Sequence, residues 1–237
     1  MRFLSWHEDP SQTAIFQQPW RPAKNMESVP GALPRIAIID HHDSYTRNFL
    51  SLLTACVSFP VTDKLLADRV VVIPHTHPAL KPENFQRHLF PHLDALILSP
   101  GPGKPTEEVD FGMSASLLRH AELVQMPVLG VCLGHQGIAT SFGAAIKGLP
   151  EPVHGIKRKL TMVADEPGRQ RPYGARNILE GLPDGTGVIC YNSLAVDEAC
   201  KCEQYWLQVT DGCSIATRDS RHSVVYGVIR AAYNPGS

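Results

Sequence analysis

The sequence predicts an α/β fold: a doubly wound, mostly parallel sheet with helices on both faces and an antiparallel extension. Near-continuous apolar runs alternate with helical patterns between Arg35 and about Gly143, as expected for strands that are buried on both faces. Beyond Gly143 the alternation stops. Short strand-like segments joined by turns follow, and they could either extend the sheet or form an antiparallel flap.

The elements of the alternating part follow in order. RIAIID (35–40) is the first buried strand, and SYTRNFLSLLTAC (44–56) predicts a helix with Phe49, Leu52, Leu53 and Cys56 on one face. Strands are then predicted in RVVVIP, DALILSP and PVLGV, and helices in KPENFQRHLFPHL, FGMSASLLRHAEL and HQGIATSF. The later strands are predicted in KRKLTMVA, GVICYN, YWLQVT, CSIATR and VVYGVI.

The composition excludes several classes of protein. A chain of 237 residues suits one domain with or without an appendage, and a net charge of -1 gives no basic surface for nucleic acid. No apolar run approaches the about 20 residues of a membrane span. The N-terminus MRFLSWHEDP lacks the apolar segment of a secretory signal, and six cysteines in this length indicate reduced thiols, so we expect a cytoplasmic protein. No metal site is expected.

The first 34 residues are expected to be a disordered leader. They show no sustained period and contain Pro10, Pro19, Pro22, Pro30 and Pro34. Such a segment cannot bury enough apolar surface to offset the entropy of ordering it.

The stretch GVCLGHQG (130–137) places Cys132 between an apolar run and a helix. Ligands of open α/β sheets sit beyond the carboxyl ends of the strands, and G-x-C-x-G is the spacing of a nucleophile elbow. The helix N-terminus favours the thiolate, and the amide of Leu133 is placed to receive an oxyanion. The alternative is a buried structural cysteine, which is what we expect of Cys56 and Cys190. The glycine spacing and the location favour a nucleophile.

A second glycine motif, SPGPGKP (99–105), follows the neighbouring strand. It has neither the Walker A spacing nor that of G-x-G-x-x-G. Its place at a strand's carboxyl end makes the Gly101 amide a natural second oxyanion donor.

Several motifs resemble those of class I glutamine amidotransferases: GVCLGHQGIA, LSPGPGKP, the HG of His154–Gly155 and YNSLAV (191–196). Within that family the chain is similar to the glutaminase part of aminodeoxychorismate (p-aminobenzoate) synthase, and IDHHDSYTRNFLSLL and VVVIPHTHPAL resemble the fungal type. The glutaminase of anthranilate synthase is the alternative. The resemblance implies an amidotransferase domain over residues 35–230 with a truncated C-terminus, followed by a divergent tail over residues 231–237.

The resemblance also implies a reaction. A cysteine thiolate attacks the side-chain amide of glutamine, ammonia departs, and water cleaves the thioester. The ammonia then passes to a synthase domain or subunit that aminates chorismate for folate synthesis, and no cofactor is implied. By motif Cys132 is the nucleophile and the amides of Gly101 and Leu133 form the oxyanion hole. The glutamine-binding residues are Gly101, Gly103, Gln136, Ser193 and Leu194. The family often has YHSL where this chain has Asn192.

The base of the reaction is missing from its expected place. The family's last strand reads YGVQFHPES, whereas YGV (226–228) here continues as IRAAYNPGS, so Ala231 and Tyr233 stand where the catalytic His and Glu belong. The departure begins directly after the shared YGV, which favours a truncated or mis-spliced product over a point substitution. His135 and His154 are weak substitutes, since a helix N-terminus disfavours imidazolium at His135 and His154 belongs to the HG turn. An inactive glutamine-binding module and an unrelated cysteine hydrolase are the alternatives.

Overall fold

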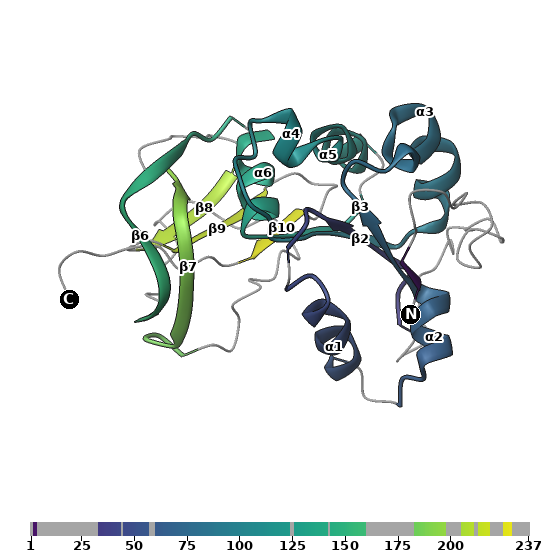
Figure 1. Ribbon diagram of the computed structural model, residues 1–237, viewed down its shortest axis with the longest axis horizontal. Coiled ribbons are helices and arrows are strands. Elements are labelled where there is room, and N and C mark those ends of the chain that lie inside the picture. Colours follow the sequence, from purple (N-terminus) through teal and green to yellow (C-terminus); the bar gives the residue numbers. More distant parts are fainter. Residues whose placement is uncertain are drawn as a thin grey trace, which may run out of the picture.

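The computed structural model describes residues 2–3, 33–43, 45–56, 60–123, 126–141, 143–159, 183–197, 205–210, 213–218 and 225–228 (Figure 1). Within this part of the chain, no helix is both long enough and apolar enough to cross a membrane.

The main sheet has the strand order β1-β3-β2-β4-β5-β10-β9-β8. Its strands are β1 (Arg2–Phe3), β2 (Ile36–Asp40), β3 (Val70–Pro74), β4 (Ala95–Leu98), β5 (Val128–Val131), β8 (Tyr205–Thr210), β9 (Cys213–Arg218) and β10 (Val225–Val228). Neighbours from β1 to β10 pair in parallel, and β10, β9 and β8 pair antiparallel. The predicted fold class, a mostly parallel sheet with an antiparallel extension, is confirmed.

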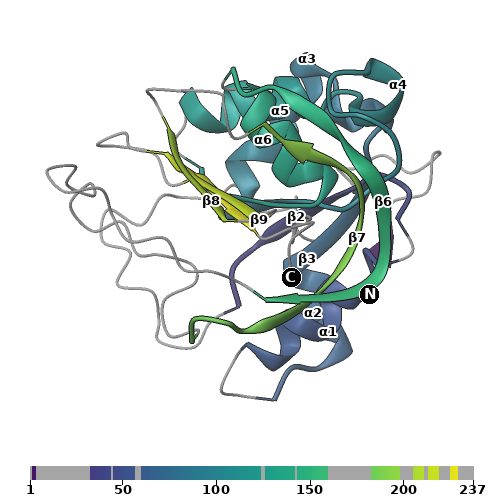
Figure 2. The ribbon, with the colours of Figure 1, turned by 90° about the vertical axis from the view of Figure 1, so that its left-hand side faces the viewer.

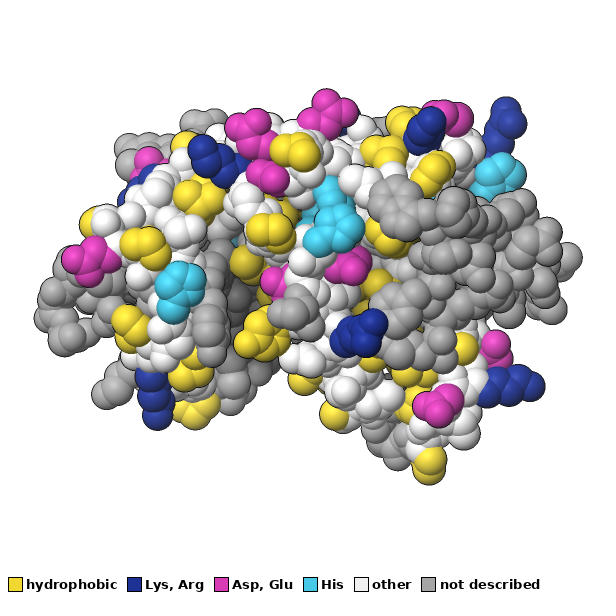
Figure 3. All heavy atoms as spheres, in the orientation of Figure 1, with side chains coloured by type: hydrophobic (Ala, Val, Ile, Leu, Met, Phe, Trp, Pro, Cys, Tyr) yellow, Lys and Arg dark blue, Asp and Glu magenta, His cyan; other side chains and the backbone are white. Residues whose placement is uncertain are grey.

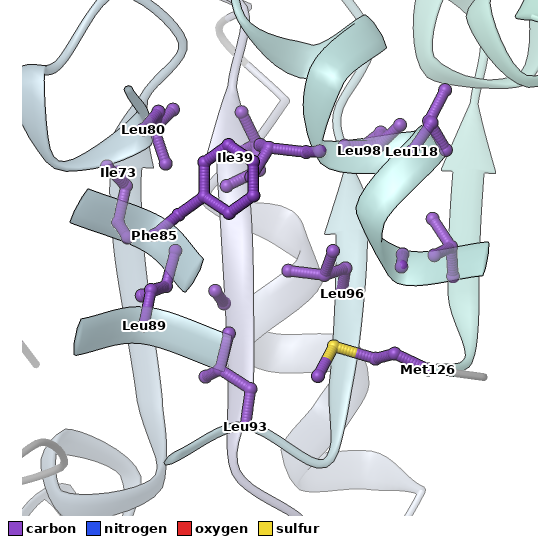
Figure 4. Packing of buried hydrophobic residues seen from close by; sticks show 14 of the residues in the cluster. Ile39, Ile73, Leu80, Phe85, Leu89, Leu93, Leu96, Leu98, Leu118 and Met126 are labelled. Atoms are coloured by element: carbon purple, nitrogen blue, oxygen red, sulfur yellow. The ribbon is translucent and has the colours of Figure 1, made fainter. Parts of the chain in front are cut away.

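Alternate residues of each strand enter cores on opposite faces of the sheet. In β2, Ala37 and Ile39 join one buried cluster, whereas Ile36 and Ile38 join the other. The first cluster is larger and includes buried residues of α4 (Glu108–Phe111), α5 (Ser114–Leu123) and α6 (Leu133–Ser141) (Figures 1 and 4). It also includes Phe85, Leu89 and Phe90, from the helical segment that follows α3 (Pro82–Asn84). The second lies under α1 (Asn48–Ala55) and α2 (Asp63–Arg69). Strands buried on both faces explain the near-continuous apolar runs.

The predicted apolar face of α1 is wrong for Leu52 and Cys56 and right for Phe49 and Leu53. Leu50 is the buried residue of this helix, Phe49 and Leu53 pack beside it, and Leu52 is 57% exposed. Cys56 follows the last helical residue and is also exposed, so it is no core residue, whereas Cys190 is buried as expected. The sequence of the helix allows two overlapping apolar faces. The face centred on Leu50 is the one that packs against the sheet.

Other helices differ from the predictions in their boundaries. The segment 81–93 is helical but changes type, from α3 through a π-helical stretch Phe85–Leu89 to a 3₁₀ turn Phe90–His92. The predicted helix 111–123 begins late, as α5 at Ser114, because Phe111 ends the preceding helix α4 and Gly112, with a φ of 56°, separates the two. Helix α2 was not predicted, although Thr62 caps it by accepting a hydrogen bond from the Leu65 amide.

Strands β6 (Ile146–Lys159) and β7 (Gly187–Val196) form a separate antiparallel pair that curves beside the main sheet (Figure 2). Both alternatives for the second half of the chain are therefore realised: β8 to β10 extend the sheet and β6–β7 form a flap. β6 begins well before the predicted KRKLTMVA segment, whose residues 160–164 lie outside the described residues.

The predicted leader falls mostly outside the described residues, at 4–32, and there it stays a prediction. Two contacts of residues 1–34 are described. Arg2–Phe3 form the edge strand β1, which pairs with β3, and Leu33 is 3% exposed in the second core cluster.

Candidate active site

The candidate site lies at the carboxyl ends of three parallel strands. β2 has β3 on one side and β4 on the other, so the chain reverses its direction of travel across the sheet at this point. Such a switch point is where open α/β sheets bind ligands. His41 follows β2, Ser99 and Gly101 follow β4, and Cys132 follows β5.

Cys132 occupies a strained turn between β5 and α6. Its φ is 55°, which few residues with a Cβ adopt, and its carbonyl accepts the first hydrogen bond of α6 from the Gln136 amide at 2.9 Å. A Cβ on Gly130 would lie 2.6 Å from the Gly134 carbonyl carbon, so strand and helix approach too closely for a side chain there. The cysteine is partly exposed. This is the conformation that the G-x-C-x-G spacing predicts.

The PGPG turn packs directly against this elbow. A Cβ on Gly101 would meet the Leu133 side chain at 2.7 Å and the Cβ of His41 at 2.5 Å. The Gly134 amide donates to the Ser99 carbonyl at 3.2 Å, which joins the start of α6 to the end of β4. Gly101 and Leu133, the two expected oxyanion residues, therefore lie side by side.

Gly103, at the other end of the same turn, packs against α4. Its φ is 82°, and a Cβ there would collide with the carboxylate of Asp110 in α4, which also accepts a hydrogen bond from the Lys104 amide at 2.8 Å. These contacts tie Gly103 to α4 and do not reach Cys132. Its expected role in binding glutamine stays a prediction.

Gln136 connects the elbow helix to β7. Its side chain is 2% exposed, and its Nε2 donates to the Leu194 carbonyl at 3.1 Å. Ser193 is exposed and Leu194 is partly buried beside it. Residues of the GHQ and YNSL motifs, more than fifty positions apart in the chain, thus meet at one edge of the site.

Strand β10 leads toward the same place. It pairs in parallel with β5, and Val228 lies opposite Val131. Val228, the last described residue of the chain, therefore lies on the strand next to the one that the elbow follows. Ala231 and Tyr233, where the resemblance expects a His and a Glu, lie outside the described residues.

The sequence reasoning missed His41 as a member of this site. Its side chain is 1% exposed and stacks on Phe111, with ring centroids 5.1 Å apart. Nε2 lies 2.9 Å from the Ser114 hydroxyl, and Nδ1 lies 3.3 Å from the Ser99 hydroxyl. The signal was a histidine directly after a buried strand, at the carboxyl end. His41 packs against the turn that carries Gly101, and its backbone amide donates a hydrogen bond to the Ser99 hydroxyl.

His41 is a buried member of a cluster of histidine rings, and Figure 3 shows a patch of histidine atoms near the middle of one face of the molecule. The ring of His75 lies 5.3 Å from that of His41 and 4.9 Å from that of His42. Burial lowers the pKa of His41 to about 3, with the nearby His75 adding to the effect. Burial also lowers the pKa of His75, and His42 acts in the same direction. Both buried rings are therefore neutral at pH 7.

Stability should consequently fall as the pH is lowered below about 6.5, the ordinary histidine pKa. Between pH 6.5 and the pKa of His41 in the folded protein, about 3, His41 binds a proton in the unfolded chain but stays neutral in the folded one. Each such group costs about 1.4 kcal/mol per pH unit. Urea unfolding at several pH values should show a shallower loss in His41→Asn than in the unsubstituted chain. His88→Asn, at an exposed position, is the control and should keep the original slope. An unchanged slope in His41→Asn would contradict the assignment.

Together, a cysteine in a strained strand-to-helix turn and a glycine turn packed against it define an α/β protein with the backbone geometry of a nucleophile elbow. The chain belongs to the family Glutamine amidotransferase class-I, whose family model matches residues 37–229.

Relatives of the chain carry two kinds of name. Aminodeoxychorismate synthase of Streptomyces griseus is 37% identical over 164 residues, which cover 69% of this chain but 19% of that protein. Anthranilate synthase component 2 of Methanothermobacter marburgensis is 29% identical over 195 residues, covering 81% of this chain and 87% of that protein. Among solved structures, a glutamine amidotransferase from Thermotoga maritima shares the fold, with a TM-score of 0.50, 15% identity and coverage of 83% and 74% of the two chains.

Proposed function

We propose that this chain is a glutaminase domain in which Cys132 attacks the side-chain amide of glutamine. The observation that carries the proposal is the φ of 55° at Cys132, in a turn against which the Gly101 loop is packed. A positive φ at a non-glycine residue is strain that a protein keeps where a side chain must be presented.

The chemistry follows from these positions. The N-terminus of α6 favours the thiolate of Cys132, whose sulfur bonds to the amide carbon of glutamine. The carbonyl oxygen becomes an oxyanion, and the amides of Gly101 and Leu133 are its proposed donors. The carbon–nitrogen bond then breaks, the nitrogen takes a proton and leaves as ammonia, and a glutamyl thioester remains. Water cleaves the thioester to glutamate and regenerates the thiol.

Glutamine would bind between α6 and β7. Gln136 already spans the two elements through the Leu194 carbonyl, and the backbone of Ser193 and Leu194 is proposed to hold the α-substituents of the substrate. Gly103 is proposed to line the same pocket.

The names of the relatives support a chorismate-aminating partner as the consumer of the ammonia. Because the matched region is 19% of the Streptomyces protein, the partner is proposed to be a further domain or a separate subunit. We propose the p-aminobenzoate branch, on the resemblance of IDHHDSYTRNFLSLL to the fungal type, with anthranilate synthesis as the alternative. The proposal covers residues 35–230 and a cytoplasmic site, where thiols stay reduced.

An inactive glutamine-binding module is the second candidate. It is favoured by Ala231 and Tyr233, which cannot act as the general acid and its orienting carboxylate. The two candidates share the glutamine site and differ in turnover.

L-Glutamine should slow the alkylation of Cys132 by iodoacetamide, because bound substrate covers the thiol. L-Asparagine, shorter by one methylene, should protect much less at the same concentration. The rate is measured by mass spectrometry of the peptide that contains Cys132, and the exposed Cys56 serves as an internal control whose rate should not change. Equal rates at Cys132 with and without glutamine would contradict both candidates. Protection without glutamate release would favour the inactive module.

A further inference from the structure

The carbonyl of Leu194 accepts two side-chain hydrogen bonds. Gln136 Nε2 donates to it at 3.1 Å and Asn192 Nδ2 donates to it at 3.3 Å. A carbonyl oxygen has two lone pairs, so both acceptor positions are taken. The Leu194 carbonyl therefore cannot serve as an acceptor for the α-ammonium of a bound amino acid.

The carboxamide oxygen of Asn192 is a free acceptor among the described residues. Asn192 is 2% exposed, and its Oδ1 is buried without a hydrogen-bond partner among the residues that the structure describes. The assignment of the two amide atoms is fixed by the Leu194 carbonyl, which can only accept a hydrogen bond. If Oδ1 and Nδ2 exchanged places, two acceptors would face each other and the hydrogen bond from Nδ2 would be lost. Buried acceptors are normally paired, so Asn192 Oδ1 calls for a donor that the described residues do not supply.

We propose that Asn192 Oδ1 accepts a hydrogen bond from the α-ammonium of glutamine, which makes Asn192 a specificity-determining residue. The inference rests on the proposed function. An α-ammonium is a donor-only group with a full positive charge, and it binds acceptors more strongly than a neutral donor does. A neutral carboxamide oxygen meets it without burying an unpaired negative charge in the unliganded protein.

The position of Asn192 fits this role. It precedes Ser193 and Leu194 directly, and Leu194 is bridged to Gln136. The backbone amide of Gln136 donates to the Cys132 carbonyl, so Gln136 lies one helical turn after Cys132. Asn192 thus lies on β7, the strand that Gln136 joins to the helix following Cys132.

The test compares L-glutamine with glutaramate, which is glutamine without its α-amino group. Each is assayed for protection of Cys132 against iodoacetamide, and the ratio of the two half-protecting concentrations is the readout. In the unsubstituted chain glutamine should be the better protector by roughly tenfold or more. In Asn192→Leu and Asn192→Ala the ratio should fall toward one, whereas Asn192→Asp, which keeps an acceptor, should retain the preference.

A merely structural role for Asn192 predicts another pattern, in which both ligands weaken together and the ratio stays high. That result in either Asn192→Leu or Asn192→Ala, whichever keeps a cooperative thermal transition, would overturn the inference. Failure of the proposed function is distinguishable, because glutamine would then give no protection even in the unsubstituted chain.

Discussion

Replacing IRAAYNPGS (229–237) with a segment beginning QFHPES should raise glutamate release from glutamine by about a thousandfold or more. β10 pairs in parallel with β5, and Val228 lies opposite Val131, so the new histidine would follow the strand next to the one that Cys132 follows. The leaving nitrogen needs a proton, and a histidine oriented by a carboxylate is the usual donor. The unmodified chain should show negligible turnover.

Intermediate variants separate the contributions of the two residues. Because members of a triad act as a unit, a segment with the His but with Gln in place of the Glu should recover part of the gain. Cys132→Ser in the fully repaired chain should abolish it. If the unmodified chain already matches the repaired one, another base exists, and His135→Asn and His154→Asn would locate it.

Gly134→Ala should lower the free energy of unfolding by about 3 kcal/mol or more. A Cβ at this position would collide with the Leu98 carbonyl oxygen and lie 2.6 Å from the Leu98 Cβ. The backbone of a central strand cannot move aside as a flexible side chain can, so α6 would have to shift away from β4. Urea denaturation measures the change.

Gly148→Ala is the matched control, because nothing lies within 4 Å of a Cβ there. Its free energy of unfolding should stay within about 0.5 kcal/mol of the original, as for ordinary surface substitutions. Equal effects of the two substitutions would show that α6 does not press on β4 as described.

Much of the fold could be predicted because burial on both faces leaves a simple sequence pattern. Runs such as RIAIID and DALILSP contain few polar residues, and they became β2 and β4. Helix α2 was missed because its seven residues are short for a periodic pattern, although Thr62 marked its start. The apolar face of α1 was predicted only in part. Phe49, Leu50, Leu52 and Leu53 follow one another so closely that more than one helical face is apolar.

The site could be predicted only where its geometry is local. The elbow depends on neighbours of Cys132 in the sequence, and its positive φ matches the glycine spacing. The contact of His41 with Ser114 joins residues 73 positions apart, and that of Gln136 with Leu194 joins residues 58 apart. Such contacts leave no periodic signal in the sequence. The packing of His41 against Gly101 and the two hydrogen bonds to the Leu194 carbonyl could therefore be found only in the folded structure.

Cys132 is proposed to be a nucleophile that recognises glutamine. This role is tested most directly by a chloroketone analogue of L-glutamine, with the modified residue located by peptide mass spectrometry. Exposure alone would favour Cys56, which is exposed, over Cys132, which is partly buried. We expect modification at Cys132 first, with excess glutamine suppressing it. Modification of Cys56 at an equal or greater rate, unaffected by glutamine, would show that Cys132 is not the glutamine-directed nucleophile.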